Sequence, residues 1–308
     1  MPELPEVETI RRGLAEVLPG KRIVGFEVRL AKMFQNAGAE GTSRIIGAIV
    51  EAVDRRGKTL IIGLSSGVTL LIHLKMTGQL IYRDGNEIVL AGGHPTKDIL
   101  AAMPIKHTHA IFSFDDDSTL FFNDLRTFGY IRLVPSDEVP ALPTMKAYGP
   151  EPLGREFTEA LFTERLKRRP NAKLKPLLLD QGFLAGLGNI YVDESLNLAK
   201  IHPLRTAGSL TKSQQQELFG AIRIILKTAL KYGGTSDNTY VTIRGGKGDY
   251  LTRARVYHRT GLPCRACGTT IERIVVAGRG THVCPQCQKK SRSAGVTHRG
   301  SNAAGERR

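Results

Sequence analysis

Long apolar runs, an export leader and tryptophan are all missing from this 308-residue chain. No uninterrupted apolar stretch reaches the roughly 18 residues that a transmembrane helix requires, so we expect no membrane span. The N-terminus lacks the basic-then-apolar layout of a signal peptide, so we do not expect secretion. Neither a long repeat nor an aromatic-rich low-complexity tract is visible. The length predicts roughly two or three domains.

Acidic residues are scarce relative to basic ones. The chain has 44 Lys and Arg against 29 Asp and Glu, which gives a formal net charge of +15. This excess favours a polyanionic partner, most simply nucleic acid, bound in a salt-sensitive way. Ribosomal, membrane-surface and merely soluble basic proteins share the property, so charge alone does not identify the partner.

Cysteine is also scarce, and every cysteine lies in one of two CxxC pairs, Cys264/Cys267 and Cys284/Cys287. Each pair presents two sulfurs at a tight turn, and two such turns complete a tetrahedral zinc site. Two disulfides are the alternative, which the missing export signal disfavours. Four thiolates would fill the coordination sphere, so we expect one structural Zn²⁺ that does no chemistry. Between the pairs, 272–277 and 281–283 read as short strands, with Arg279 at the tip of their turn.

Hydrophobic periodicity divides the rest of the chain into a β-rich part and a helical part. Residues 4–18 show helical spacing, and Pro19-Gly20 ends that helix. Short strand patterns separated by turns then predict a β-sandwich. We place these strands at 22–30, 47–55, 59–64, 68–73, 79–83, 109–114, 119–123 and 129–134. The weakly patterned segment 84–106 is predicted to be a loop or an insertion.

A proline-rich stretch, 135–155, resembles a linker, and helical patterns follow it at 157–168, 173–181, 191–198 and 211–231. A glycine-punctuated turn, 182–189, joins the second and third of these helices. The glycine-rich segment 233–250 predicts a mobile loop, and the basic tail after Cys287 predicts disorder. The predicted domains are therefore 1–134, linker 135–155, 156–260, finger 261–290 and tail 291–308.

Pro2 opens the run Pro2-Glu3-Leu4-Pro5-Glu6 directly after Met1. A small second residue usually allows removal of the initiator methionine, which would leave a secondary amine beside carboxylates. Such an amine can attack a sugar carbon and form a Schiff base. A proline iminium has no N–H to lose and so stays cationic. The plainer alternative is that Pro2 and Pro5 merely start a helix, where proline is well tolerated.

Several motifs together resemble one family. The chain begins PELPEVET, has Arg56-Gly57-Lys58 at the start of a strand, and continues with the motifs HLKMTG (73–78), DLRTFG (124–129) and GLGNIY (186–191) before the cysteine pairs. This chain is similar to the Fpg/MutM family, the formamidopyrimidine-DNA glycosylases, over about residues 1–288. The resemblance implies an α+β multidomain fold with an N-terminal β-sandwich and helix, a helix-two-turn-helix domain and a C-terminal zinc-ribbon finger.

The resemblance also implies an activity. The family binds damaged double-stranded DNA, excises oxidised purines such as 8-oxoguanine and formamidopyrimidines, and then cuts the abasic strand by β,δ-elimination without a redox cofactor. By this likeness Pro2 is the nucleophile and Glu3 the general acid/base that serves sugar-ring opening. Glu6 is a structural and electrostatic partner of the N-terminal amine, and Lys58 acts near the damaged base and its flanking phosphate.

Further residues match the family's DNA contacts. Met76, Arg126 and Phe128 resemble the trio that fills the hole left by an extruded base; without the resemblance, the sequence would favour core positions for Met76 and Phe128. The resemblance places phosphate contacts at Asn189 and Arg279, and at Lys173 or Lys175 unless these lie on a solvated face. One histidine of His107-Thr108-His109 is expected to contact backbone, unless it is a strand-edge core residue. Thr127 stands where many relatives carry a basic residue.

Two rival functions stay open from sequence. One is an endonuclease VIII-type glycosylase for oxidised pyrimidines, which Leu4 disfavours because that group tends to have glycine there. The other is a catalytically silent DNA-binding protein on the same scaffold, which the intact Pro2, Glu3 and Lys58 disfavour. The segment 233–250 takes the place of the family's lesion-capping loop, though its central residues are unusual. We expect a monomer in the cytoplasm, associated with the nucleoid through DNA.

Overall fold

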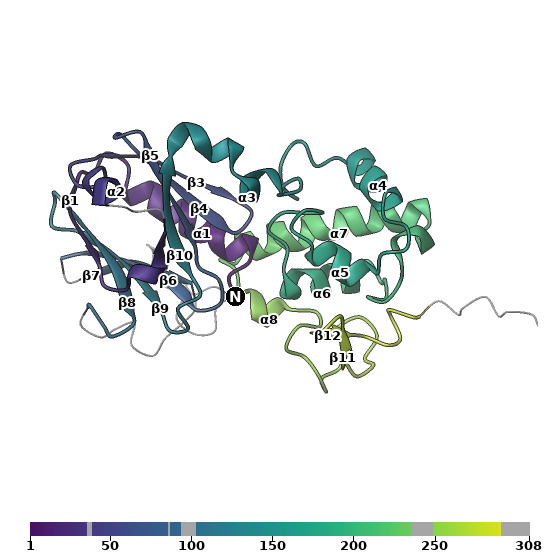
Figure 1. Cartoon of the computed structure of the whole chain (residues 1–308). Helices are drawn as coiled ribbons and strands as arrows, with labels where there is room; N and C mark the ends of the chain where they lie inside the picture. Colours follow the sequence, from purple (N-terminus) through teal and green to yellow (C-terminus); the bar gives the residue numbers. More distant parts are fainter. Residues whose placement is uncertain (36–38, 86, 94–102, 236–248, 291–308) are drawn as a thin grey trace, which may run out of the picture.

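The computed structural model describes residues 1–35, 39–85, 87–93, 103–235 and 249–290. Within these ranges, none of the helices combines the length and the apolar character that crossing a bilayer requires. The described chain forms a β-rich half, a helical half and a small hairpin finger, and the N-terminus lies where the two halves meet (Figure 1). The predicted order of β-sandwich, helices and finger is confirmed.

Two five-stranded sheets form the β-sandwich, in the orders β1-β8-β9-β6-β7 and β2-β10-β5-β4-β3. Alternating strand residues face each other across the sandwich and form one apolar core, which includes Leu60, Ile72, Phe112 and Phe122. The strands are β1 (Ile23–Val28), β2 (Phe34–Gln35), β3 (Val50–Arg56), β4 (Thr59–Leu64), β5 (Val68–His73), β6 (Gly78–Asp84), β7 (Glu87–Gly93), β8 (Thr108–Phe114), β9 (Thr119–Asp124) and β10 (Tyr130–Pro135).

The first helix, α1 (Leu4–Val17), connects the two halves. It buries Val7, Ile10 and Leu14 in the sandwich core, as its periodicity predicts. It lies along β3 and β7 and also contacts α7 of the helical half. The residues before α1 are therefore held where the β-rich half meets the helical half.

The prediction of a loop over 84–106 is wrong for 87–93. This stretch forms β7, which pairs antiparallel with β6 and buries Leu90 and Ala91. Three of its seven residues, Ala91 to Gly93, are small, so the sequence pattern is weak and pairing with β6 decides the structure. Residues 94–102 lie outside the described ranges. No pattern in the sequence predicted β2 or the short helices η1 (Ala31–Met33) and α2 (Ala39–Ser43).

The helical half has its own apolar core, built from α4 to α7 and the turns between them. Its helices, with the preceding connection, are η3 (Ser136–Ala141), α3 (Pro143–Lys146), α4 (Glu159–Lys167), α5 (Leu174–Leu179), α6 (Asn189–Leu198), η4 (Ala207–Ser209), α7 (Lys212–Lys231) and α8 (Tyr250–Arg253). The proline-rich connection between the halves is thus folded into short helices.

The finger consists of the hairpin β11 (Glu272–Val276) and β12 (Arg279–Val283) with the cysteine turns on either side. Ala277 and Gly278 both have positive φ, as a two-residue hairpin turn requires. Arg279 therefore begins β12, paired with Val276, and the expectation that it lies at the tip of the turn is wrong.

Candidate active site between the halves

Glu3 and Glu6 are both buried where α1 meets the helical half. Glu6 Oε2 accepts a hydrogen bond from the Glu3 backbone N–H at 2.9 Å. Glu6 Oε1 accepts hydrogen bonds from the Tyr191 hydroxyl and from the Thr235 N–H and hydroxyl. Glu6 thus fixes the backbone of the N-terminal run against α6 and the end of the described segment 103–235.

The Glu3 carboxylate lies at the N-terminus of α6. It accepts hydrogen bonds from the backbone N–H of Ile190 at 3.0 Å and of Tyr191 at 3.4 Å. Burial raises the pKa of Glu3 to about 7; the neighbouring Glu6 adds to the rise, and Lys58 and the two helix amides oppose it. A carboxyl group whose pKa lies near neutrality can both donate and accept a proton at physiological pH.

Gly188 allows this close approach. A Cβ on Gly188 would lie only 2.3 Å from Cδ of Glu3. Its backbone is extended, with φ −136°, so the position needs glycine for space and not for conformation. This gives a physical reason for one glycine of the turn 182–189 that the sequence singled out.

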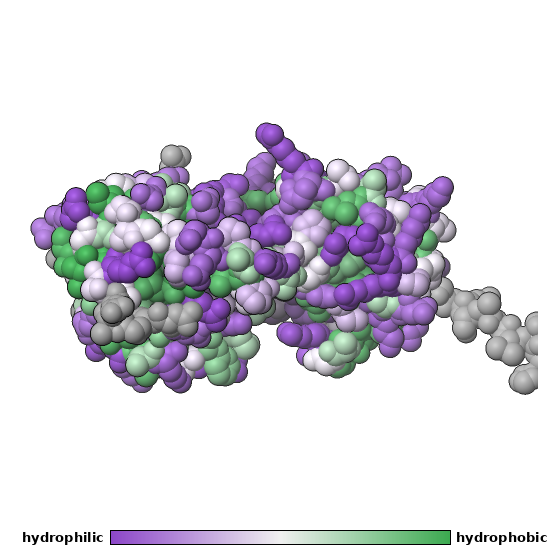
Figure 2. All heavy atoms as spheres, turned by 45° about the horizontal axis from the view of Figure 1, so that its top comes forward, coloured by the Kyte–Doolittle hydropathy of each residue, from purple (hydrophilic) through white to green (hydrophobic). Residues whose placement is uncertain are grey.

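A cavity of about 350 Å³ brings together residues from every part of the chain. Met1, Glu3, Lys58, Asn189 and Arg279 all line it, and His73, Lys75, Met76, Tyr148 and Tyr257 complete much of the wall. Pro2 is buried beside these residues, and its nitrogen is an amide while Met1 is attached. Figure 2 shows a recess at the lower edge where the two halves meet, with hydrophilic side chains over much of the helical half.

Lys58 and His73 add an unusual electrostatic environment. Lys58 is 6% exposed, and burial lowers its pKa against the opposing attraction of Glu3 and Glu6. Burial, with Lys75 and Lys58 nearby, lowers the pKa of His73 to about 3, so His73 is neutral. Its Nδ1 accepts the Lys75 N–H at 3.0 Å, which leaves the proton on Nε2. His73 belongs to the motif 73–78, yet no local pattern in the sequence marks it as a residue of the site.

Met76, Arg126 and Phe128 form an exposed cluster on the β-rich half. Met76 is 42% exposed and Phe128 is 53% exposed, which excludes the core interpretation of both. The Arg126 guanidinium lies 4.7 Å from the Phe128 ring centroid, and its Nη1 lies 3.1 Å from Sδ of Met76. An apolar pair beside an arginine suits insertion into a disrupted base stack.

Asp124 holds that cluster in place. Its carboxylate accepts the N–H groups of Arg126, Phe128 and Gly129 and the hydroxyl of Thr77. Asp124 is fully buried, so its two oxygens set the conformation of the whole loop 124–129. At the neighbouring Thr127, the hydroxyl accepts a hydrogen bond from Lys32 Nζ at 2.8 Å, so a basic group does lie at this place.

Asn189 and Arg279 meet at the edge of the cavity. Asn189 Nδ2 donates to the carbonyl of Gly280 at 3.0 Å, which joins the start of α6 to the finger hairpin. Arg279 is exposed and lines the cavity. Lys173 is also exposed, at the start of α5.

Lys175 and His109 do not fit a DNA contact. Lys175 is fully buried, and its Nζ forms an ion pair with Asp193 at 2.6 Å and donates to Gly280 O at 3.2 Å. His109 is 6% exposed, and its Nε2 is bonded to the carbonyl of Asp124 at 2.7 Å. Both are therefore structural, and the alternative of a strand-edge core histidine holds for His109. His107 is partly exposed and stays a candidate.

The four cysteine sulfurs lie within 4.8 Å of one another. The separations are 3.9 Å for Cys264–Cys287, 3.5 Å for Cys267–Cys284 and 3.4 Å for Cys267–Cys287. Tetrahedral zinc with bonds of about 2.3 Å spaces its sulfurs by roughly 3.8 Å, so this donor set fits a zinc ion. The apolar core of the finger is small, and its buried members include Val256, Ile271 and two of the cysteines.

Comparisons with known proteins point to the same family for successive parts of the chain. Family models match for the formamidopyrimidine-DNA glycosylase N-terminal domain over residues 1–131, for the H2TH domain over 148–241, and for the zinc finger found in FPG and IleRS over 261–290. The chain is 43% identical over 290 residues to the formamidopyrimidine-DNA glycosylase of Pelotomaculum thermopropionicum, and 44% identical over 292 residues to that of Desulforamulus reducens. Each match covers 94% of this chain and 99% of the relative.

Solved structures give the same result. The chain is similar to Lactococcus lactis Fpg in a complex with DNA that contains an abasic site, with a TM-score of 0.83 and 38% identity. It is also similar to a mutant of that protein bound to DNA that contains Fapy-dG, with a TM-score of 0.82 and 39% identity. Both matches cover 94% of this chain and 100% of the solved chain.

Proposed function

The chain belongs to the formamidopyrimidine-DNA glycosylase family, and from this membership we propose that it excises oxidised purines from duplex DNA and then cuts the abasic strand. One observation carries the assignment of the site: the N-terminus, Glu3 and Lys58 share a single cavity with Asn189 and Arg279. A sugar held there would meet the nucleophile, a proton donor and phosphate-binding groups at once.

The first step uses Pro2 after removal of Met1. The damaged nucleotide leaves the base stack, because the amine cannot reach the sugar inside a duplex. The Pro2 nitrogen forms a bond to the anomeric carbon as the glycosidic bond breaks, and the base departs with the electron pair and takes up the proton that the nitrogen loses. Protonated Glu3 donates its proton to the ring oxygen as the sugar opens, which leaves an iminium ion on Pro2.

The later steps follow from the iminium. It acidifies the adjacent sugar proton; loss of this proton expels the 3′ phosphate, and a second elimination expels the 5′ phosphate. Ionised Glu3 can accept a proton in these steps, because its pKa lies near 7. Water finally hydrolyses the Schiff base and restores the Pro2 amine.

Exposed and partly exposed side chains provide the DNA contacts of the proposal. Met76, Arg126 and Phe128 fill the space left by the extruded base, and Arg126 can hydrogen-bond the unpaired cytosine. Asn189, Arg279, Lys173 and His107 bind backbone phosphates, supported by the net charge of +15. The lesion-capping loop predicted at 233–250 consists largely of residues 236–248, which lie outside the described ranges. The basic tail, 291–308, also lies outside them.

We further propose a metal ion, a set of domain boundaries and an oligomeric state. Four cysteines hold one structural zinc ion, which orders the finger and therefore Arg279. We propose the domain boundaries 1–134, linker 135–155, 156–260, finger 261–290 and tail 291–308. The protein acts as a monomer, because each group of the proposed site comes from one chain, and it acts in the cytoplasm, associated with the nucleoid through DNA.

Borohydride trapping on a duplex with one 8-oxoguanine opposite cytosine tests the proposal, with Pro2→Gly as the control. We expect a covalent protein–DNA band that requires the lesion and maps to the N-terminus. A band on a thymine-glycol duplex alone would support the endonuclease VIII-type alternative, which the named relatives do not favour. Tight binding without a band on either duplex would support the silent binder, and retention of Met1 in N-terminal mass analysis would explain it.

A further inference from the structure

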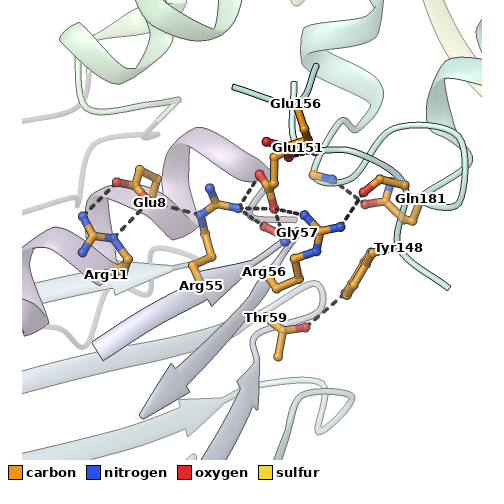
Figure 3. A network of polar contacts seen from close by, with 12 residues as sticks. Glu8, Arg11, Arg55, Arg56, Gly57, Thr59, Tyr148, Glu151, Glu156 and Gln181 are labelled. Carbon is orange, nitrogen blue, oxygen red and sulfur yellow. Dashed lines mark hydrogen bonds and ion pairs between the residues drawn. The ribbon is translucent and has the colours of Figure 1, made fainter. Parts of the chain in front are cut away.

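One carboxylate, Glu151, holds the chain immediately before Lys58. Glu151 Oε1 accepts the backbone N–H of Gly57 at 2.7 Å, and the Arg55 guanidinium binds both carboxylate oxygens at 3.1 and 3.0 Å. Figure 3 shows the Glu151 side chain directed toward Arg55, Arg56 and the Gly57 amide, at the turn between β3 and β4. Glu151 lies in the connection to the helical half, 94 residues from Gly57 along the chain.

This contact belongs to a partly buried network of acidic and basic side chains. Arg55 is 12% exposed, Glu151 is 14% exposed and Glu8 of α1 is 13% exposed. Arg55 Nε donates to Glu8 Oε2 at 3.1 Å, and Arg56 lies 3.8 Å from Glu151 Oε1. Arg55 Nη1 alone donates to both oxygens of Glu151, and such charge-assisted hydrogen bonds are stronger than bonds between neutral groups. Removal of the Glu151 charge would leave the 12% exposed Arg55 with one acidic partner, Glu8, in place of two.

The residue after Lys58 is held by the same segment. The Thr59 hydroxyl lies 3.1 Å from the Tyr148 hydroxyl, and Arg56 Nη2 donates to the Gly149 carbonyl at 2.8 Å. The Tyr148 ring also packs on Gly57, where a Cβ would lie 2.7 Å from Cε1 of the ring. The residues on both sides of Lys58 are thus fixed to 148–151.

We propose that Glu151 is a positioning residue for Lys58. Its carboxylate fixes the turn 55–57, so the buried ammonium group of Lys58 is kept on the wall of the cavity that Glu3 also lines. The same carboxylate joins this turn to the connection between the halves, and through it the walls of the cavity keep their relative position. This inference rests on the proposed function, because excision is the reaction that Lys58 serves.

Single-turnover excision of 8-oxoguanine at saturating enzyme tests the inference. We expect Glu151→Gln to lower the rate constant by about tenfold or more, and the duplex Kd to stay within about threefold of wild type. Tyr148→Phe removes only the hydroxyl bound to Thr59, so we expect a smaller loss of about threefold, and it carries the test if Glu151→Gln does not fold. Glu164→Gln, at an exposed ion pair with Arg168, is the matched control and leaves the rate unchanged.

The amplitude and the rate constant separate positioning from folding. A merely structural role lowers the fraction of competent enzyme, which reduces the amplitude and leaves the rate constant intact. Unchanged rate constants in Glu151→Gln and Tyr148→Phe, or a loss confined to amplitude or to Kd, would overturn the inference. Failure of the wild-type protein to excise the base would instead reject the proposed function.

Discussion

Gly188→Ala is the sharpest test of the active-site geometry, because one methyl group would act on Glu3 without straining the backbone. The φ of −136° at Gly188 is open to alanine, whereas the new Cβ would lie 2.3 Å from Cδ and 2.4 Å from Oε1 of Glu3. Carbon atoms pack at about 3.5–4.0 Å, so the carboxylate must move by about 1 Å or more. That movement breaks the 3.0 Å hydrogen bond from the Ile190 N–H.

The size of the effect follows from that hydrogen bond. A hydrogen bond to a charged group contributes about 1.5–3 kcal/mol, which corresponds to a factor of about 10 to 100 in rate. We therefore expect the single-turnover excision rate of Gly188→Ala to fall by about 10- to 100-fold. Overpacking should also cost about 1–3 kcal/mol of stability, so the assay is run well below the unfolding temperature.

A matched variant and a background test isolate the cause. Gly220→Ala lies on α7 with no atom within 4 Å of the new Cβ, so it should stabilise the helix by about 1 kcal/mol and leave excision unchanged. In a Glu3→Gln background, Gly188→Ala should have little further effect, because both changes act on the same side chain. A wild-type rate in Gly188→Ala, or a full additional loss in that background, would refute the reasoning.

Two further predictions concern protonation and metal. Burial raises the pKa of Glu3 from 4.5 to about 7, so its contribution to stability is complete below pH 4.5 and is lost as the pH rises through 7. Between pH 5 and pH 8, the free energy of unfolding of Glu3→Gln in urea should therefore rise relative to that of wild type by on the order of 3 kcal/mol. A constant difference between the two proteins would contradict this. Chelation should release about one zinc per chain and unfold the finger, because the finger core is too small to fold alone. Arg279 would then leave its position, and trapping should be abolished while the main unfolding transition remains. Trapping that is unaffected by complete zinc release would argue against the site.

Local patterns in the sequence predicted most of the helices and strands and the cluster of four cysteines. The helix from residue 4 follows from apolar spacing, and the four cysteines follow from two CxxC pairs, because both signals depend on neighbours a few residues apart. Most strands of the sandwich were predictable in the same way. β7 was not, since its small residues acquire strand structure only through pairing with β6.

Burial divided residues that look alike in sequence. Lys173 and Lys175 are two residues apart, yet Lys173 is exposed and Lys175 is fully buried against Asp193. Met76 and Phe128 are apolar yet exposed, because Asp124 binds both the loop that carries Phe128 and the Thr77 hydroxyl beside Met76. His73 is the first residue of the motif 73–78, but its neutral state comes from burial beside Lys75 and Lys58.

The sequence by itself therefore determined which groups this protein carries: a proline after Met1 and beside carboxylates, Lys58 before a strand, an excess of basic residues and two CxxC pairs. Only the tertiary structure decided how these groups act together. Glu3, Lys58 and Arg279 are far apart in the chain, and they line one cavity because α1, β4, α6 and the finger pack around it. The shifted pKa values and the clamp of Glu151 on the turn before Lys58 arise from burial and long-range contact, which no local pattern encodes.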